Sequence, residues 1–340
     1  MTPHFQKICI VGAGAIGGWI GAGLARAGCQ VAMLARGQTL AALLRDGLQL
    51  HSGPPDAPSV QVHRVAASDS AAALGPQDLV VVAVKAPAMR DVALQLAPLL
   101  QPHTVVLPAM NGVPWWFLQD FGGPFADKRL DTVDPGGAIS AHVPPAGIVG
   151  CVVHASCSLA APGVVRHGFG NRLIVGEPSR LRSERLVALG ELLQRAGFEV
   201  DVSTAIQRDI WFKLWGNMTM NPVSAITGAD SHRILDDPLV RGFCSQVMLE
   251  AREIGARLGI PIDQQPQDRH AVTRKLGRFK TSMLQDVEAG KAIELDALLT
   301  VVRELGQRTG VATPLIDALL ALARLQARIK GLYPWPGTAP

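Results

Sequence analysis

Four polar features stand where successive apolar, strand-like segments of the N-terminal half end. They are the glycine turn of Gly12, Ala13, Gly14, Ala15, Ile16 and Gly17, followed by Arg36, Lys85 and Asn111. In an open parallel sheet the carboxyl ends of the strands converge on one crevice, where such folds bind their ligands. Glycine-lined backbone, two cations and an amide are groups that grip phosphate. The spacing therefore predicts a dinucleotide-dependent enzyme.

The glycine turn carries most of this prediction. It follows the apolar run Lys7–Val11 and opens the segment Ala15–Ala27, which is rich in small, helix-compatible residues. Gly12 allows the tight turn, Gly14 lets the backbone approach a pyrophosphate, and Gly17 lets the helix pack on the strand. The diphosphate would lie at the helix N-terminus, where free N–H groups and the helix dipole favour negative charge. The alternative is a glycine-rich turn of another α/β fold.

Arg36 indicates the type of dinucleotide. Sheets that bind NAD place an acid after the second strand to hold the ribose hydroxyls, whereas those that bind NADP place a cation there for the 2′-phosphate. Here Arg36 is followed by Gly37, and the first acid after it is Asp46. We therefore predict NADPH/NADP as the cofactor, contacted also by Lys85 and Asn111. The alternatives are a surface arginine in a loop and a merely solvated lysine.

A second set of polar residues lies in the C-terminal half. Lys213, Asn217 and Asn221 are spaced four residues apart, so they form one stripe along a predicted helix. The residues around them are bulky and apolar, and a lysine partly buried among such residues is a usable proton donor. The alternative is an ordinary solvent-facing stripe. Because Asn221 precedes Pro222, we expect the helix to bend or end there.

Composition excludes several classes of protein. Of the 340 residues, 48% are hydrophobic and 18% charged, which is typical of a compact soluble chain. The net charge is +4, but scattered cations and one tyrosine predict no nucleic-acid-binding face, and nine dispersed histidines predict no metal site. Glycines interrupt the apolar stretch 8–25, so no membrane span is predicted. Five cysteines without a CxxC pair indicate reduced thiols in a cytoplasmic protein.

The order of segments predicts an α/β fold, with an N-terminal Rossmann-type doubly wound sheet and a C-terminal all-helical domain. We expect an NADP-binding domain over 1–204, a helical substrate and catalytic domain over 205–330, and a loosely held tail over 331–340. The strands expected in the main sheet are Lys7–Val11, Gln30–Ala35, Val60–Ala66, Leu79–Val84 and Thr104–Leu107, with helices at Leu40–Asp46 and Ala88–Leu100. After an irregular stretch over 113–150, we expect an antiparallel extension of Cys151–Ala160, Gly163–His167 and Arg172–Val175, then a helix at Ser183–Ala196 and a strand at Glu199–Val202. The helical domain is expected to contain Ile206–Met220, Leu239–Leu258, Lys291–Thr309 and Pro314–Ile329.

Five sequence motifs together resemble the ketopantoate reductase family (2-dehydropantoate 2-reductase). In chain order they are KICIVGAGAIG with Arg36, AVKAP around Lys85, MNG around Asn111, KLWGNMTMNPVSAITG from Lys213 and SMLQDVEAGKAIELD from Ser282. They span nearly the whole chain. The Lys-x3-Asn-x3-Asn-Pro and SMLQD…E motifs are much more specific than the glycine motif, so the resemblance rests mainly on them.

The resemblance implies a Rossmann domain joined to a helical domain, with NADPH in the cleft between them and a small 2-keto acid as substrate. The implied reaction converts 2-dehydropantoate to (R)-pantoate in pantothenate biosynthesis. Alone, Ser282 and Glu294 indicate only a helix cap and a solvated charge. By position in the motifs, the resemblance implies that Lys213 is the general acid and that Glu294 is an acid near both the substrate and the nicotinamide ribose. It implies substrate binding for Asn217, Asn221 and Ser282. It implies cofactor contacts for Lys85 and Asn111. A pair between Lys213 and Glu294 would hold the lysine charged and aimed.

One departure from the family keeps other functions open. The segment 113–150 is longer than in compact members and carries Trp115 and Trp116, which could reshape the substrate pocket. An alternative function is therefore the reduction of a bulkier 2-oxo acid or carbonyl by a family paralogue. A second alternative, from another class, is a non-catalytic NADP-binding sensor. Apolar helices in the second domain are compatible with a homodimer.

Overall fold

The computed structural model describes residues 5–54 and 56–335, and its chain packs into two compact units. The sheet unit comprises Met1–Met110, Trp116–Arg129 and Gly136–Asp209, and the helical unit comprises Asn111–Trp115, Leu130–Pro135 and Ile210–Pro340. The chain thus passes from one unit to the other five times. One of the short segments is fixed within the helical unit because the Glu304 carboxylate accepts the backbone N–H groups of Asp131 and Thr132, at 3.1 and 3.0 Å.

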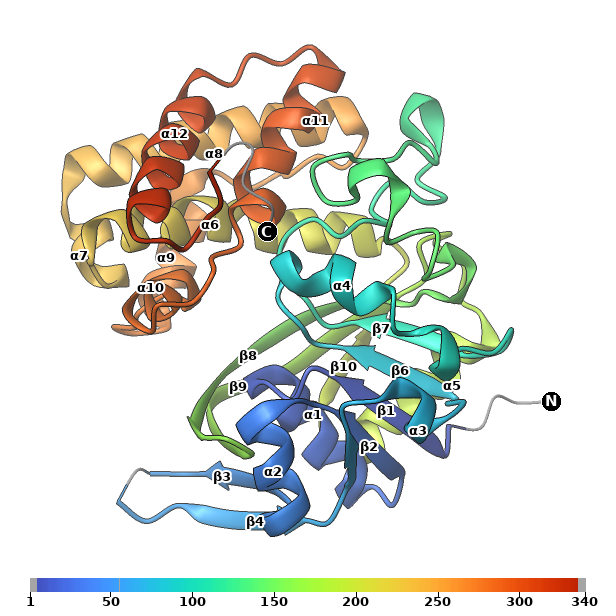
Figure 1. The fold of residues 1–340 in the computed structure, drawn as a ribbon. Helices are drawn as coiled ribbons and strands as arrows, with labels where there is room; N and C mark the ends of the chain where they lie inside the picture. Colours follow the sequence, from blue (N-terminus) through green and yellow to red (C-terminus); the bar gives the residue numbers. More distant parts are fainter. Residues whose placement is uncertain (1–4, 55, 336–340) are drawn as a thin grey trace. The chain divides into compact units, whose positions relative to one another are not determined.

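A parallel sheet of five strands in the order β5-β2-β1-β6-β7 forms the centre of the sheet unit (Figure 1). Its strands are β1 Lys7–Val11, β2 Gln30–Leu34, β5 Ala66–Ser68, β6 Leu79–Val82 and β7 Val105–Pro108. Because β2 and β6 flank β1 on opposite sides, the sheet winds in both directions from β1, as predicted. The four strands that precede the predicted polar features, β2, β1, β6 and β7, are neighbours in this sheet.

A second sheet, in the order β10-β9-β3-β4 with β8 also paired to β9, completes the unit. Its strands are β3 Leu48–Ser52, β4 Ser59–His63, β8 Gly150–Ala161, β9 Val164–Gly176 and β10 Glu199–Val202. The antiparallel extension is confirmed, but two of its expected strands are the single strand β9. The prediction of one main-sheet strand at Val60–Ala66 is wrong, because its first part is β4. Val60 and Val62 alternate along β4 and are about half exposed, so this segment suits an edge strand and not a central one.

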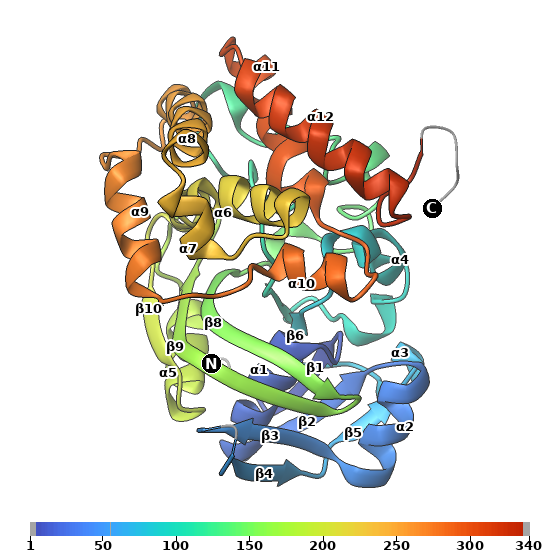
Figure 2. The ribbon, with the colours of Figure 1, turned by 90° about the vertical axis from the view of Figure 1, so that its left-hand side faces the viewer.

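Helix α1 (Ala15–Arg26) lies between the two sheets (Figures 1 and 2). Its glycines allow this close packing on both sides. A Cβ atom on Gly21 would lie 3.2 Å from Ile10 of β1, while one on Gly18 would lie only 2.5 Å from Val165 of β9. The small residues that mark the predicted helix are therefore needed for packing, since larger side chains would push the sheets away from the helix.

The other helical segments of the sheet unit are short, apart from α2 and α5. They are α2 Gly37–Asp46, α3 Ala71–Leu74, η1 Ala86–Ala88, α4 Met89–Ala93, η2 Ala97–Leu99 and α5 Glu184–Arg195. The single helix expected at Ala88–Leu100 is wrong. Pro87 and Pro98 lie in the first turns of η1 and η2, where the missing N–H group does no harm, and they divide the segment. The stretch before β8 is irregular, as predicted, and contains the 3-10 turns η3 Gly123–Phe125, η4 Pro135–Gly137 and η5 Pro145–Gly147.

The helical unit is built almost entirely from helices, which confirms the predicted class. They are α6 Ile206–Thr227, α7 Ser231–Asp236, α8 Pro238–Leu258, α9 Pro266–Lys275, α10 Ser282–Glu288, the π-helical turn η6 Asp296–Thr300, α11 Val301–Thr309 and α12 Pro314–Ile329. The predicted helix Lys291–Thr309 begins only at Asp296. Of the expected tail, Leu332 is buried and Tyr333 donates to the Asp296 carboxylate at 2.7 Å, which holds this part of the chain in place, while 336–340 lie outside the described residues.

Of the bend or end expected at Asn221, the end is wrong, because helix α6 continues through Pro222 to Thr227. A proline inside a helix removes one hydrogen bond and costs about 3 kcal/mol. Met218, Asn221 and Val223 are all at least 94% buried, so this part of α6 is enclosed by the rest of the unit. Burial of its apolar side chains offsets the penalty, because tertiary packing supplies most of the stability of helices in proteins.

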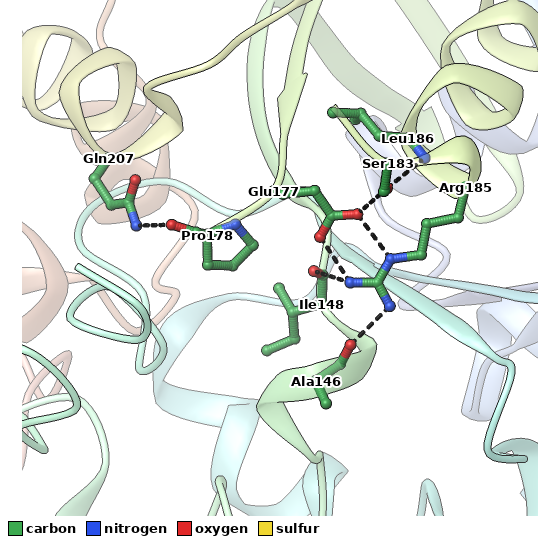
Figure 3. Close-up of polar contacts among 8 residues, drawn as sticks. All are labelled: Ala146, Ile148, Glu177, Pro178, Ser183, Arg185, Leu186 and Gln207. Atoms are coloured by element: carbon green, nitrogen blue, oxygen red, sulfur yellow. Dashed lines mark hydrogen bonds and ion pairs between the residues drawn. The ribbon is translucent and has the colours of Figure 1, made fainter. Parts of the chain in front are cut away.

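A buried carboxylate connects the end of β9 to the start of α5 (Figure 3). The side chain of Glu177 is 4% exposed and binds the Arg185 guanidinium through two bonds of 2.6 and 2.7 Å. The Ser183 hydroxyl, which caps α5, donates to the same carboxylate at 2.5 Å. Arg185 also donates to the carbonyl of Ala146 at 2.7 Å. One ion pair therefore fixes three segments that are distant in sequence.

We expect Glu177→Gln to lower the free energy of unfolding by about 2 kcal/mol, because it removes the buried carboxylate that binds the partly exposed Arg185 guanidinium. Urea unfolding followed by circular dichroism measures the change. The matched control is Asp201→Asn, which removes the carboxylate of the solvent-exposed pair between Arg172 and Asp201 and is expected to cost less than about 1 kcal/mol. Equal losses in the two variants would contradict this assignment of the buried pair.

Candidate active site

The glycine turn after β1 is a tight turn that closes on the start of α1. Gly12 has a φ of +97°, a conformation that side chains other than glycine rarely adopt. A Cβ atom on Gly17 would lie 2.1 Å from the carbonyl oxygen of Gly12, so the turn can close on the helix only with glycine at this position. Two of the three motif glycines are thus required by the protein's own fold.

Gly14 differs from the other two glycines. Its φ of −81° suits any residue, and nothing lies within 4 Å of the position that its Cβ atom would take. It caps α1 without a side-chain hydrogen bond, and the first turn of the helix contains no acidic residue. Open space beside the positive end of a helix is suited to a phosphate group, which would need the close backbone approach that glycine allows.

Arg36 and Lys85 follow the two strands that flank β1. Arg36 precedes α2 and is exposed, and its side chain forms no hydrogen bond or ion pair within residues 5–54 and 56–335. Asp46, the first acid after it, lies at the other end of α2 and is bound by Arg45 at 2.7 Å. Lys85 is partly buried and precedes η1. The sheet order therefore places the glycine turn between the loops that carry these two cations.

In the helical unit, the ammonium group of Lys213 donates a hydrogen bond to the Asn111 amide oxygen at 2.7 Å. The two residues are 102 positions apart in the sequence. Sequence reasoning assigned Asn111 to the cofactor and missed this contact. Since Asn111 follows β7 by only three residues, a segment that emerges from the main sheet orients the side chain of the predicted proton donor.

The loop that carries Asn111 is held by the π-helical turn η6. The N–H group of Val113 donates to the carbonyl oxygen of Ala297 at 2.9 Å. Between them lies Gly112, with a φ of +83° and only 2.4 Å between its virtual Cβ atom and the same oxygen. No other residue fits there. Because Glu294 precedes Ala297 by three residues, the segment of Glu294 lies beside the loop of Asn111.

Large aromatic side chains fix the helix that carries Lys213. The indole N–H of Trp215 donates to the carbonyl of Met248 in α8 at 2.7 Å, and Trp215 is buried. Trp211 packs against Gly255 of α8, where a Cβ atom would lie 2.4 Å from its indole nitrogen. With these two residues anchored on α8, the Lys213 stripe faces away from α8, because it lies on another side of the helix.

The other predicted site residues lie in varied surroundings. Asn217 is partly buried on α6, and Asn221 is 5% exposed one turn further. Ser282 is exposed in the first turn of α10, but the cap is Thr281, whose hydroxyl accepts the N–H of Leu284 at 3.2 Å. The Ser282 hydroxyl is thus left for another role.

The two tryptophans after Asn111 are core residues. Trp115 and Trp116 are 6% and 2% exposed. The Trp116 ring would meet a Cβ atom on Gly150 at 2.5 Å, so it packs in the interior of the sheet unit. Both rings therefore contribute buried apolar surface to the structure.

The part of the chain that the structure describes contains neither a candidate metal site nor a candidate membrane-spanning helix. No group of three or more His, Cys, Asp or Glu residues there could hold a metal ion. No described helix is long and apolar enough to cross a membrane. The five cysteines are free thiols, and burial raises the pKa of Cys9, Cys157 and Cys244 to about 12.

Comparison with known proteins identifies the family. The model "Ketopantoate reductase PanE/ApbA" matches residues 8–115, and "Ketopantoate reductase PanE/ApbA C terminal" matches residues 205–327. The 2-dehydropantoate 2-reductase of Mesorhizobium japonicum is 43% identical over 329 residues, which cover 96% of this chain and 100% of that protein. This chain belongs to the ketopantoate reductase family. All the predicted site residues fall inside the two matched ranges.

A solved structure supports the assignment to this family. A Ralstonia solanacearum protein assigned as a ketopantoate reductase is 55% identical and has a TM-score of 0.92, over 97% of this chain and 100% of that one. D-mandelate dehydrogenase, solved with NADH and anilino(oxo)acetate, is 20% identical with a TM-score of 0.81, over 96% of this chain and 100% of that one. The second likeness shows a shared fold.

We expect Gly14→Ala to leave the free energy of unfolding within about 0.5 kcal/mol of wild type, because the added methyl group enters open space. The same variant should weaken NADPH binding by about tenfold or more, since the methyl group blocks the approach of the diphosphate. Calorimetric titration with NADPH and urea unfolding measure the two effects. Gly17→Ala, which clashes with Gly12, should instead lose stability; undiminished NADPH affinity in Gly14→Ala would refute the phosphate site.

Proposed function

We propose that this chain is a cytoplasmic, NADPH-dependent 2-dehydropantoate 2-reductase, which reduces 2-dehydropantoate to (R)-pantoate for pantothenate biosynthesis. The observation that carries the proposal is the Lys213–Asn111 hydrogen bond, because it presents an aimed ammonium group within a family of keto acid reductases. The name of the Mesorhizobium japonicum relative supports the same substrate.

Lys213 acts as the general acid in the proposed reaction. Bound NADPH supplies the hydride, which is added to the keto carbon of the 2-oxo acid. Lys213 gives its proton to the keto oxygen as negative charge develops there, and it regains a proton from solvent afterwards. One hydride and one proton convert the carbonyl to a hydroxyl group. The neutral Asn111 oxygen aims the ammonium group without removing its proton.

Neutral hydrogen-bonding groups orient the substrate. We assign Asn217, Asn221 and Ser282 to this role, since amides and a hydroxyl bind polar substrate atoms without competing for the transferred proton. Glu294 is assigned to the substrate and the nicotinamide ribose, and a pair with Lys213 would keep the lysine charged. Burial of Asn221 favours this role over contact with bulk water, because buried polar groups need partners.

The chain's own residues favour NADPH over NADH. Arg36 is exposed beside the glycine turn and is suited to the 2′-phosphate, while Asp46, which could hold ribose hydroxyls, is bound to Arg45 at the far end of α2. Lys85 and Asn111 complete the proposed cofactor contacts. The residues present therefore fit the phosphorylated dinucleotide.

The proposed function is tested by NADPH oxidation against several 2-oxo acids, 2-dehydropantoate among them. We expect Lys213→Ala to lower kcat by about 100-fold or more, with NADPH affinity close to wild type, because a general acid contributes to the chemical step. Faster turnover of a bulkier 2-oxo acid would replace the substrate assignment. A Lys213→Ala variant with the wild-type kcat would rule out the proton-donor role. A wild-type protein that binds NADPH but reduces none of the 2-oxo acids would favour a cofactor-binding sensor.

We expect Arg36→Ala to weaken NADPH binding by about 10- to 100-fold and to leave NADH binding nearly unchanged, since it removes a charge-assisted contact to the 2′-phosphate. Calorimetric titration with both cofactors measures this. Arg45→Ala, which removes an exposed arginine from the other end of α2, is the matched control and should change neither affinity. Equal losses for NADPH and NADH in Arg36→Ala would contradict the assignment.

A further inference from the structure

Arg269 of α9 is a guanidinium group held against α6 without a carboxylate partner. Its guanidinium carbon lies 5.5 Å from the centre of the Phe212 ring. Its Nε atom lies so near the backbone that a Cβ atom on Gly216 would be 2.5 Å away. Within the described residues, the buried Nε atom has no hydrogen-bond partner and the side chain forms no ion pair.

This lack of a partner is energetically costly. Burial lowers the pKa of Arg269, because a guanidinium loses hydration there without gaining an anion. The neighbouring arginines are better satisfied: Arg274 binds Asp236 at 2.7 Å, and Arg241 donates to the carbonyl of Leu235. Together with Arg269 these cations lower the pKa of His270, after burial itself, so the surroundings of α9 carry a positive field. Such a place favours an anion.

The position of Arg269 relates it to the proposed chemistry. Phe212 and Gly216, which it touches, are four residues apart and form one row along α6. Lys213 and Asn217 form the adjacent row. The guanidinium therefore lies one helical row from the proposed proton donor. In a 2-oxo acid the carboxylate carbon is bonded directly to the keto carbon. A cation that binds the carboxylate must therefore lie near the group that protonates the keto oxygen.

We propose that Arg269 binds the carboxylate of the 2-oxo acid substrate and so determines that the enzyme accepts free acids. The inference rests on the proposed function and deepens it. Gly216 is part of the proposed carboxylate site, since only a residue without a side chain lets the guanidinium lie against α6. The face of Phe212 keeps the group in place by a cation–π contact. Because Nε is enclosed against Gly216, the two terminal nitrogens are the donors left for the carboxylate.

The test measures binding as well as turnover. Arg269→Gln and Arg269→Lys are compared with Arg257→Gln, a matched control that removes an exposed arginine from α8. Calorimetric titration gives the Kd of (R)-pantoate, of its neutral lactone and of NADPH. Steady-state kinetics with 2-dehydropantoate as substrate give KM and kcat. A second variant, Gly216→Ala, displaces the guanidinium without removing its charge.

We expect Arg269→Gln to raise the Kd of (R)-pantoate and the KM of the keto acid substrate by about 10- to 100-fold, the range for one charge-assisted contact. Arg269→Lys should lose less, because a point charge keeps the attraction but not the paired geometry. The Kd values of the lactone and of NADPH should not change, and the control variant should bind all three ligands as the wild type does. The kcat should change little, since the contact is made equally before and during reaction. Gly216→Ala should weaken the binding of (R)-pantoate and leave the binding of the lactone unchanged.

Three results would overturn the inference. The first is (R)-pantoate affinity within twofold of wild type in Arg269→Gln, even if the variant melts earlier, which would leave the cation–π contact as its whole role. The second is weakened NADPH binding in place of weakened acid binding, which would assign the group to the dinucleotide. The third is an equal loss for the acid and the lactone.

The failure of the proposed function is a separate result. If the wild-type enzyme reduces another 2-oxo acid in preference to 2-dehydropantoate, the substrate assignment fails. The same comparison is then made with that acid and its hydroxy product, and Arg269→Gln must still raise the KM of the acid and the Kd of the product. If the wild-type enzyme reduces none of the 2-oxo acids tested, the function and the inference are both wrong.

Discussion

A single hydrogen bond, from the ammonium group of Lys213 to the amide oxygen of Asn111, sets the requirements for the rest of the site. It joins a helix to a loop that is distant in sequence, so both must be rigid for the proposed proton donor to keep its orientation. Aromatic side chains fix the helix on α8, and the glycine after Asn111 lets its loop lie against η6. Preorganisation of this kind reduces the reorganisation that catalysis would otherwise require.

The glycines of this chain serve two different purposes. At positions 12, 17 and 112 the fold itself requires them, because a side chain would strike neighbouring backbone. At position 14 the fold does not require one, and the space remains open. A glycine that the protein does not need for its own packing points to a ligand that needs it, which is why Gly14 supports a dinucleotide more directly than the motif as a whole does.

The sequence was sufficient to predict the parallel sheet, because β6 is an uninterrupted apolar strand and the glycine turn sits between strand and helix. It was also sufficient for the long helices, whose apolar periodicity is strong. It left open whether α6 bends or ends at Asn221, since local preference opposes a helix at Pro222 and only tertiary burial overrides it. The Lys213–Asn111 contact could not be predicted either, because spacing along the chain does not show which residues a hundred positions apart form hydrogen bonds. Arg269 belongs to no motif, and only its packing on Phe212 and Gly216 draws attention to it.

The interleaved path of the chain has a consequence for how such enzymes can evolve. A recombination event that exchanged everything before Ile210 for another nucleotide-binding module would also remove two short segments that belong to the helical unit. One of them contains Asn111, and the other is the stretch bound by Glu304. An exchange at this boundary would therefore separate Lys213 from Asn111, whereas a point substitution leaves both units whole.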